Sequence, residues 1–265
     1  MPPIRSDLPI INNPEPFERR TMADRYGSFY YLGLAGLVVL VGLVAWFGYQ
    51  IWSLRGVWAN IYVLNDPRRP EAERVNAAWA LSRDPRVTPR QRWDLCLSRT
   101  PPDLGRYLLA ESLTSTAVEA DPSAYAKAVA YSEGWPIWLR LLLVRPLAYA
   151  AGEGERLPNA PLDALRHHHD PIIALWATYA RSFSQGHTGE ALAELRRAAE
   201  PGGPHRELAA LLLEARQARQ PDRNAILDRA SLWLRTHHPD ALRLWQGWEE
   251  RDGRLVRRSA PDLRG

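Results

Sequence analysis

The sequence predicts an all-α protein with one N-terminal transmembrane helix, followed by an α-solenoid-like domain of antiparallel helix pairs. The first observation is a long apolar stretch with no charged residue between Arg25 and Arg55. The second is a helical hydrophobic period through most of the remaining chain, with no convincing alternating run that would indicate a strand. The predicted order is a proline-rich disordered tail at 1–25, a transmembrane helix at 26–54, a connector at 55–70, a helical-repeat domain at 71–252 and a basic flexible tail at 253–265.

The transmembrane prediction depends on the length and composition of residues 29–52. These 24 residues make roughly 36 Å of helix, which is enough to cross a hydrocarbon core of about 30 Å. Only a helix satisfies its own backbone polar groups in lipid, so we expect an uncleaved signal anchor rather than a buried core helix. Aromatic residues form an expected belt at each end: Tyr26, Phe29, Tyr30 and Tyr31 at one, and Trp46, Phe47, Tyr49 and Trp52 at the other.

The charges beside this segment predict its orientation. Three arginines precede it within a few residues, whereas Arg55 is alone on the C-terminal side until Arg68. The positive-inside rule therefore places the N-terminus in the cytoplasm and the large domain on the non-cytoplasmic side.

The glycines of the anchor indicate how it packs. No two of them are four residues apart, so the G-x-x-x-G motif of tight helix dimers is absent. We interpret Gly36 and Gly42 as lying near one side of the helix, close to Ala35. Because small residues let another helix approach, we expect the anchor to pack on a different membrane subunit rather than on its own copy.

After Asp66 the chain is predicted to form one short helix after another. Asp-Pro and Pro-Asp pairs recur as helix starts, since Asp caps free N–H groups and Pro suits the first turn. No sheet is expected within 66–252. The expected helices are 71–83, 89–99, 102–119, 122–133, 136–150, 161–168, 171–185, 188–200, 204–219, 222–236 and 239–252.

Two segments resemble known helical repeats. Residues 71–119 contain AERVNAAWALSRDPRVTPRQRWDLCL, which is similar to a HEAT-type repeat of two helices around an Asp-Pro turn. Residues 172–204 resemble a tetratricopeptide repeat, with Gly186 at the turn and a matching second helix at Glu190, Ala191, Leu192, Leu195 and Ala198. Ala191-Leu192 recurs 34 residues later as Ala225-Ile226. The resemblance implies a stack of helix pairs that binds other proteins.

The most apolar stretch of the large domain is WPIWLRLLLVRPLAY, residues 135–149. We interpret it as a central core helix whose two arginines, Arg140 and Arg145, extend outward. The alternative is a helix on the membrane surface or on a partner's transmembrane helices, contacting it through Trp135, Trp138 and these arginines.

Other chemical signals are weak. Consecutive helical residues point about 100° apart, so His167, His168 and His169 are interpreted as a solvated helix end rather than a metal site. Cys96 lies in an amphipathic helix and is interpreted as a core residue. The sequence contains no recognised hydrolase, zinc or nucleotide-binding motif, so no catalytic, metal or cofactor residue is assigned and no cofactor is expected. A net charge of +4, dispersed along the chain, does not indicate nucleic-acid binding.

The leading hypothesis is a non-catalytic, single-pass membrane scaffold or accessory subunit. It would bind other protein subunits of a membrane complex through its helical repeats and its anchor, with the bilayer as its other contact. The alternative is a membrane-tethered enzyme whose active-site residues are too dispersed to recognise.

Overall fold

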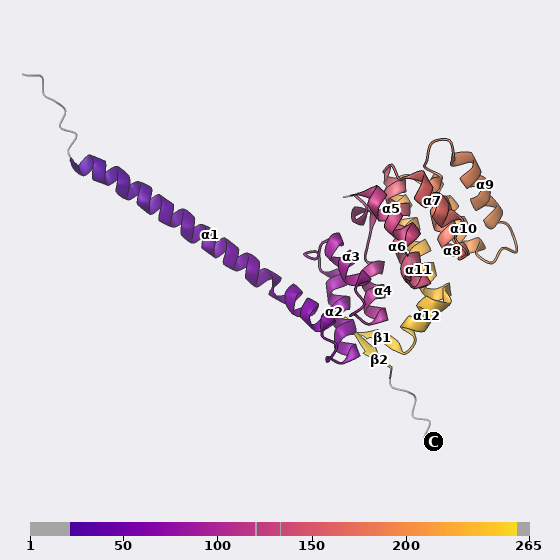
Figure 1. Ribbon diagram of the computed structural model, residues 1–265, viewed down its shortest axis with the longest axis horizontal. Helices are drawn as coiled ribbons and strands as arrows, with labels where there is room; N and C mark the ends of the chain where they lie inside the picture. Colours follow the sequence, from indigo (N-terminus) through magenta and orange to yellow (C-terminus); the bar gives the residue numbers. More distant parts are fainter. Residues whose placement is uncertain (1–21, 120, 133, 259–265) are drawn as a thin grey trace, which may run out of the picture. The chain divides into compact units, whose positions relative to one another are not determined.

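A computed structural model describes residues 22–119, 121–132 and 134–258, with side chains from Tyr30 onward (Figure 1). Residues 1–21 of the predicted tail at 1–25, and residues 259–265 of the predicted basic tail at 253–265, lie outside the described residues. The chain divides between Leu54 and Arg55 into two compact units.

The first helix, α1 (Met22–Asn65), is longer than the predicted anchor and includes most of the predicted connector. Residues 55–65 contain no proline and keep a helical pattern, in which Val57 and Leu64 are buried within the second unit. The helix ends where Asp66-Pro67 forms a turn, and the Asp66 carboxylate accepts a hydrogen bond from the Arg68 N–H at 3.0 Å.

The second unit contains eleven further α-helices and one 3₁₀ turn among the described residues. They are α2 (Glu71–Arg83), α3 (Pro89–Leu97), α4 (Asp103–Glu111), η1 (Ser115–Ala117), α5 (Pro122–Tyr131), α6 (Ile137–Glu153), α7 (Asn159–Arg166), α8 (Pro171–Arg181), α9 (Thr188–Ala198), α10 (Arg206–Gln217), α11 (Asp222–His237) and α12 (Pro239–Trp245).

Helix starts follow the predicted cap chemistry at some Asp-Pro pairs and not at others. Asp121 accepts from the Ala124 N–H at 2.8 Å, and Asp170 accepts from the N–H groups of Ile172 and Ile173. Asp84 instead follows the end of α2 and accepts from the Arg86 N–H at 2.9 Å, which makes a turn rather than a helix cap. Each of these Asp-Pro pairs therefore marks a helix start or a helix end. The aspartate side chain caps a helix at Asp121 and Asp170, and it stabilises a turn at Asp84.

Helix α6 is the centre of the core. It packs against α4 on one side and α8 on the other, and α2 packs in turn against α4 (Figure 1). Fourteen of its residues are buried, including Leu139, Leu143 and Leu147 with no exposed surface. A row of packed helices thus runs through the domain, in the order α2, α4, α6 and α8.

The C-terminal region corrects three predictions. The sequence predicted no sheet within 66–252, a helix to residue 252 and a flexible segment from 253, but β1 (Trp248–Arg251) and β2 (Arg254–Arg257) form an antiparallel hairpin. Asp252 and Gly253 have positive φ angles of 50° and 73°, as the tight two-residue turn of a hairpin requires. Aspartate and glycine accept this conformation at little cost, so the turn reverses the chain where helix was expected.

The hairpin is attached to α2 through backbone polar groups of β2. The Asn76 side chain donates to the Leu255 carbonyl at 2.7 Å and accepts from the Leu255 N–H at 2.8 Å, so one amide occupies both groups. Trp79 Nε1 donates to the Gly253 carbonyl at 3.1 Å. A buried cluster lies beneath: Val75, Trp79, Leu104, Leu108, Trp248 and Leu255.

These contacts bring the end of the described chain back to its early helices. Helix α11 packs on α10 and α6, α12 packs on α4 and α6, and β2 packs on α2 (Figure 1). In a linear solenoid each unit contacts only its neighbours, and these returning contacts differ from that pattern. The fold is mostly helical as predicted, and the assignment to a repeat family stays a prediction.

Candidate functional site

The first candidate surface is the apolar part of α1. Residues Tyr30–Asn65 form a helix long and apolar enough to cross a membrane, and none of its most apolar window is buried by protein. The belt residues with described side chains are all exposed: Tyr30, Tyr31, Trp46, Phe47, Tyr49 and Trp52. The side chains of Tyr26 and Phe29 lie outside the described residues. This is the one such helix in the described chain, and its exposed apolar surface fits lipid rather than water.

Helix geometry corrects the interpretation of the two anchor glycines. Six residues at about 100° each place Gly36 and Gly42 about 120° apart around the axis, so they do not share a face. Gly42 instead shares a face with Ala35, seven residues away and about 20° apart. A Cβ added at either glycine meets no atom within 4 Å, so both positions are open to a neighbouring helix or to lipid.

A second aromatic surface lies on α1 beyond the anchor. Trp58 and Tyr62 are 59% and 67% exposed, whereas Val57 and Leu64 of the same helix are buried. Residues four apart lie on the same helical face, so the two rings form one aromatic face, which we call the Trp58–Tyr62 face. This face was not predicted from the sequence, because residues 55–70 were interpreted as a connector. The spacing of four residues between the two aromatics could have indicated it.

Helix α6 shows where the predicted surface-helix residues lie. Trp138 is buried beside the ring of Tyr107, and Trp135 is half-buried against Trp93. Arg140 is half-buried, donates to the Ser132 carbonyl and lies 2.9 Å from His168. The arginines were expected to extend outward, but Arg145 is only 6% exposed.

The inward turn of Arg145 has a clear cause in its hydrogen bonds. Its Nε donates to the Ser231 hydroxyl at 2.8 Å, and Nη1 donates to the Glu111 carbonyl at the end of α4. A guanidinium at a helix C-terminus also interacts favourably with the helix dipole. Helix α6 is therefore a core helix, and the predicted alternative of a membrane-surface helix is wrong.

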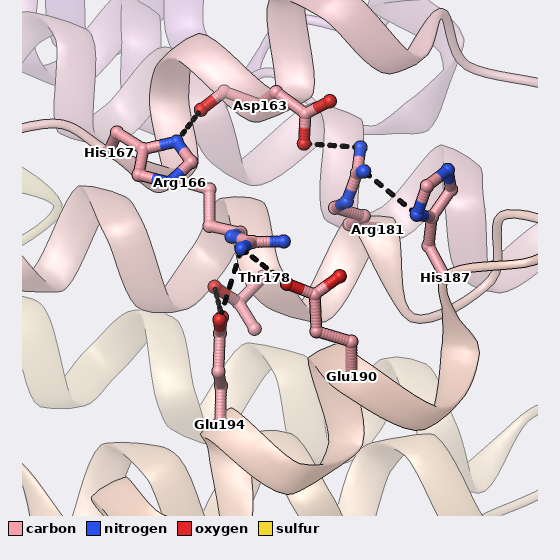
Figure 2. A network of polar contacts seen from close by, with 8 residues as sticks. All are labelled: Asp163, Arg166, His167, Thr178, Arg181, His187, Glu190 and Glu194. Carbon is pink, nitrogen blue, oxygen red and sulfur yellow. Dashed lines mark hydrogen bonds and ion pairs between the residues drawn. The ribbon is translucent and has the colours of Figure 1, made fainter.

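A polar network joins α7, α8 and α9 (Figure 2). Arg166 of α7 reaches Glu190 at 2.7 Å and Glu194 at 3.2 Å, both on α9. Arg181 of α8 is buried and pairs with Asp163 of α7 at 2.5 Å, while its other side contacts His187 at 2.9 Å. Each arginine thus links two helices, which fixes three helices to one another.

The electrostatics of this network favour a structural role. The hydrogen bond from Arg166 holds the pKa of Glu190 below its usual value, and the same bond raises the pKa of Arg166. Both groups therefore stay charged near neutral pH. General acid or base catalysis needs a group that exchanges its proton near the working pH, which these two do not.

The consecutive histidines His167 and His168 contact different partners. His167 Nδ1 lies 2.8 Å from the Asp163 carbonyl, and His168 Nδ1 accepts from the Asp170 N–H at 3.0 Å. Burial, with help from His169 and Arg140, lowers the pKa of His168. No group of three or more potential metal ligands occurs among the described residues.

Cys96 is completely buried in α3, and its thiol lies 3.2 Å from the Trp93 carbonyl. Burial raises the pKa of Cys96 to about 12. Because the thiolate is the reactive form, this cysteine is inert in the folded protein.

A polar cleft of about 330 Å³ lies where α2, α4, α6 and α11 meet, with Glu250 of β1 at its edge. Arg235 holds Glu111 with two hydrogen bonds of 2.6 and 3.1 Å. Arg83 pairs with Glu250 at 3.3 Å. Two of the carboxylates that line the cleft are thus already neutralised by arginines.

Comparison with known proteins gives no relative: no family model, no curated protein and no solved structure matches this chain.

Proposed function

We propose that this protein is a non-catalytic, single-pass membrane subunit that binds another membrane protein through α1 and the Trp58–Tyr62 face. Its large domain lies on the non-cytoplasmic side. The exposure of Trp58 and Tyr62 on a helix whose other face is buried carries this proposal. Tryptophan and tyrosine supply large contact area and are enriched at binding hot spots, so such a face on a folded domain fits a protein interface.

Two further features support binding rather than catalysis. The charged groups of the α7–α9 network form ion pairs with one another, and Glu111 and Glu250 in the polar cleft are paired with arginines. The anchor offers Ala35 and Gly42 on one face, where a neighbouring helix could approach closely. The partner class is therefore a protein with its own transmembrane helices.

The test compares a double aromatic substitution on α1 with a single aromatic substitution on α5, each in the full chain purified in detergent from its native membrane. Trp58→Ala with Tyr62→Ala should remove a co-purifying membrane protein, because two hot-spot rings are typically worth more than 2 kcal/mol each. Tyr131→Ala is the control, since Tyr131 is 57% exposed and belongs to α5 rather than α1. A partner retained equally by all three forms would contradict the role of this face, and a chain that purifies alone would contradict the proposed function.

Orientation is tested through cysteine labelling. Cys96 is buried and unreactive, so a cysteine introduced at exposed Glu155 in the α6–α7 loop is the only accessible thiol. A membrane-impermeant maleimide should label Glu155→Cys in intact cells or spheroplasts. Labelling only after lysis would place the domain in the cytoplasm.

A further inference from the structure

The polar cleft between α2, α4, α6 and α11 contains one cation and one anion that have no partner of opposite charge. The guanidinium of Arg145 forms the floor and, among the described residues, lies within ion-pair distance of no carboxylate. Asp228 is exposed at the rim and likewise has no basic partner in the described chain. A buried charge without a counter-charge is costly, so Arg145 is unusual in a cleft whose other two arginines are paired with carboxylates.

Two hydroxyl groups connect these charges. Arg145 Nε donates to Ser231 Oγ at 2.8 Å, Ser231 Oγ lies 3.3 Å from the Tyr149 hydroxyl, and Tyr149 donates to Asp228 at 2.7 Å. The chain of three bonds keeps Nε and the Asp228 carboxylate less than about 9 Å apart. Arg145 uses two of its five N–H groups, which leaves donors free for a ligand in the cleft.

The rest of the lining sets the shape and polarity of what fits. Leu232, which is 57% exposed, supplies apolar surface beside the two charges. Trp79 and Leu108 also line the cleft but are almost fully buried, and the Arg83 guanidinium lies 3.5 Å from the centre of the Trp79 ring. The other charged groups of the lining are paired with each other, so they neither attract nor repel a ligand strongly. A small molecule with one carboxylate, one ammonium and an apolar side chain matches all three features.

We propose that this cleft binds a free α-amino acid with an apolar side chain. The carboxylate pairs with Arg145, the ammonium pairs with Asp228 and the side chain lies against Leu232. A bidentate guanidinium–carboxylate contact is among the strongest hydrogen-bonded pairs in proteins and supplies most of the orientation. The site is separate from the Trp58–Tyr62 face.

Isothermal titration on the full chain in detergent tests the proposal with three probes of equal carbon skeleton. L-leucine carries both charges, L-leucinamide lacks the carboxylate and 4-methylpentanoate lacks the ammonium. Leucine should bind, and each analogue should bind roughly tenfold or more weakly, since each loses one charged hydrogen bond. No binding of leucine up to about 10 mM, or equal binding of an analogue, would overturn the site and would show that Arg145 and Asp228 only balance each other.

A rim substitution avoids the folding risk of changing a buried arginine. Asp228→Asn should weaken leucine to the affinity of 4-methylpentanoate, because the ammonium loses its partner. Asp222→Asn is the matched control, since it is an exposed aspartate of the same helix, outside the cleft. Unchanged leucine affinity in Asp228→Asn, or an equal loss in Asp222→Asn, would refute the assignment.

Discussion

Two apolar helices of this protein, α1 and α6, have opposite surroundings. The described anchor side chains of α1 leave their apolar surface uncovered by protein, whereas α6 buries nearly every residue among α4, α8 and α11. The difference is visible in charge and length. The anchor runs without a charge for longer than a bilayer needs, but α6 is shorter and contains Arg140 and Arg145. An apolar helix of bilayer length with no internal charge indicates lipid, and a shorter one with arginines that find polar partners indicates a protein core.

The largest expected effect tests whether α1 lies in lipid. The double substitution Val41→Arg with Val44→Arg places two charges near the middle of the anchor, at a cost of about 5–7 kcal/mol for membrane insertion. The protein should move from the membrane pellet to the supernatant on alkaline extraction. Val41→Leu with Val44→Leu should remain in the pellet. If the arginine form also remains there, α1 is not the membrane attachment.

The substitution Leu143→Ala tests whether α6 belongs to the protein core. Leu143 has no exposed surface, so its truncation should lower the free energy of unfolding of the domain by about 2–5 kcal/mol. Leu40→Ala in α1 should leave it unchanged, because Leu40 is 58% exposed. Urea unfolding can be followed by thiol labelling of Cys96, the only cysteine in the chain. Equal effects of both substitutions would mean that the anchor belongs to the folded domain.

A smaller effect is expected at the start of α8, which packs against α6. Asp170→Ala removes the acceptor for two backbone N–H groups and should cost about 0.5–2 kcal/mol. Asp240→Ala, in the first turn of α12 with no cap hydrogen bond, should change stability less. The same urea titration measures both. A larger loss at Asp240 would contradict the assigned cap.

The smallest effect concerns pH. Burial alone would raise the pKa of Asp170, but hydrogen bonds from His238 and from the N–H groups of Ile173 and Ile172 leave it below its ordinary value of 3.8. A lowered folded pKa contributes stability above the unfolded pKa, and this contribution is lost as pH falls through the folded value. Stability measured below pH 4 should therefore decline more steeply in the wild type than in Asp170→Asn. Parallel pH profiles would contradict this coupling.

Much of the helical pattern could be predicted because its signals are local. The apolar run of α1, the Asp121-Pro122 and Asp170-Pro171 starts and the helical periods each depend on a few neighbouring residues. The hairpin had a local signal too. Asp252-Gly253 between Arg251 and Arg254 is a strong turn dipeptide, but the preceding helical period and the basic composition led to the prediction of a helix and a flexible end.

The surroundings of the arginines could not be predicted, because their partners are distant in sequence. Arg145 bonds to Ser231, 86 residues away, and the Arg235–Glu111 pair spans 124 residues. Periodicity places Arg145 on a helix but does not reveal that a serine of α11 lies opposite. The cleft depends on α11 returning to α6, which is a property of the whole domain rather than of any segment.

The contact between Asn76 and Leu255 has a consequence for synthesis of the protein. The two residues are 179 positions apart, and at about 5–20 residues per second a ribosome takes roughly 10–35 s to make the chain between them. Throughout that interval α2 exists without the strand that covers Trp79 and Val75. The apolar part of α1 has been made before this interval begins, so with α1 in the membrane, as proposed, the domain waits there with an apolar surface uncovered. A nascent chain halted shortly before Leu255 should therefore be bound by chaperones or degraded.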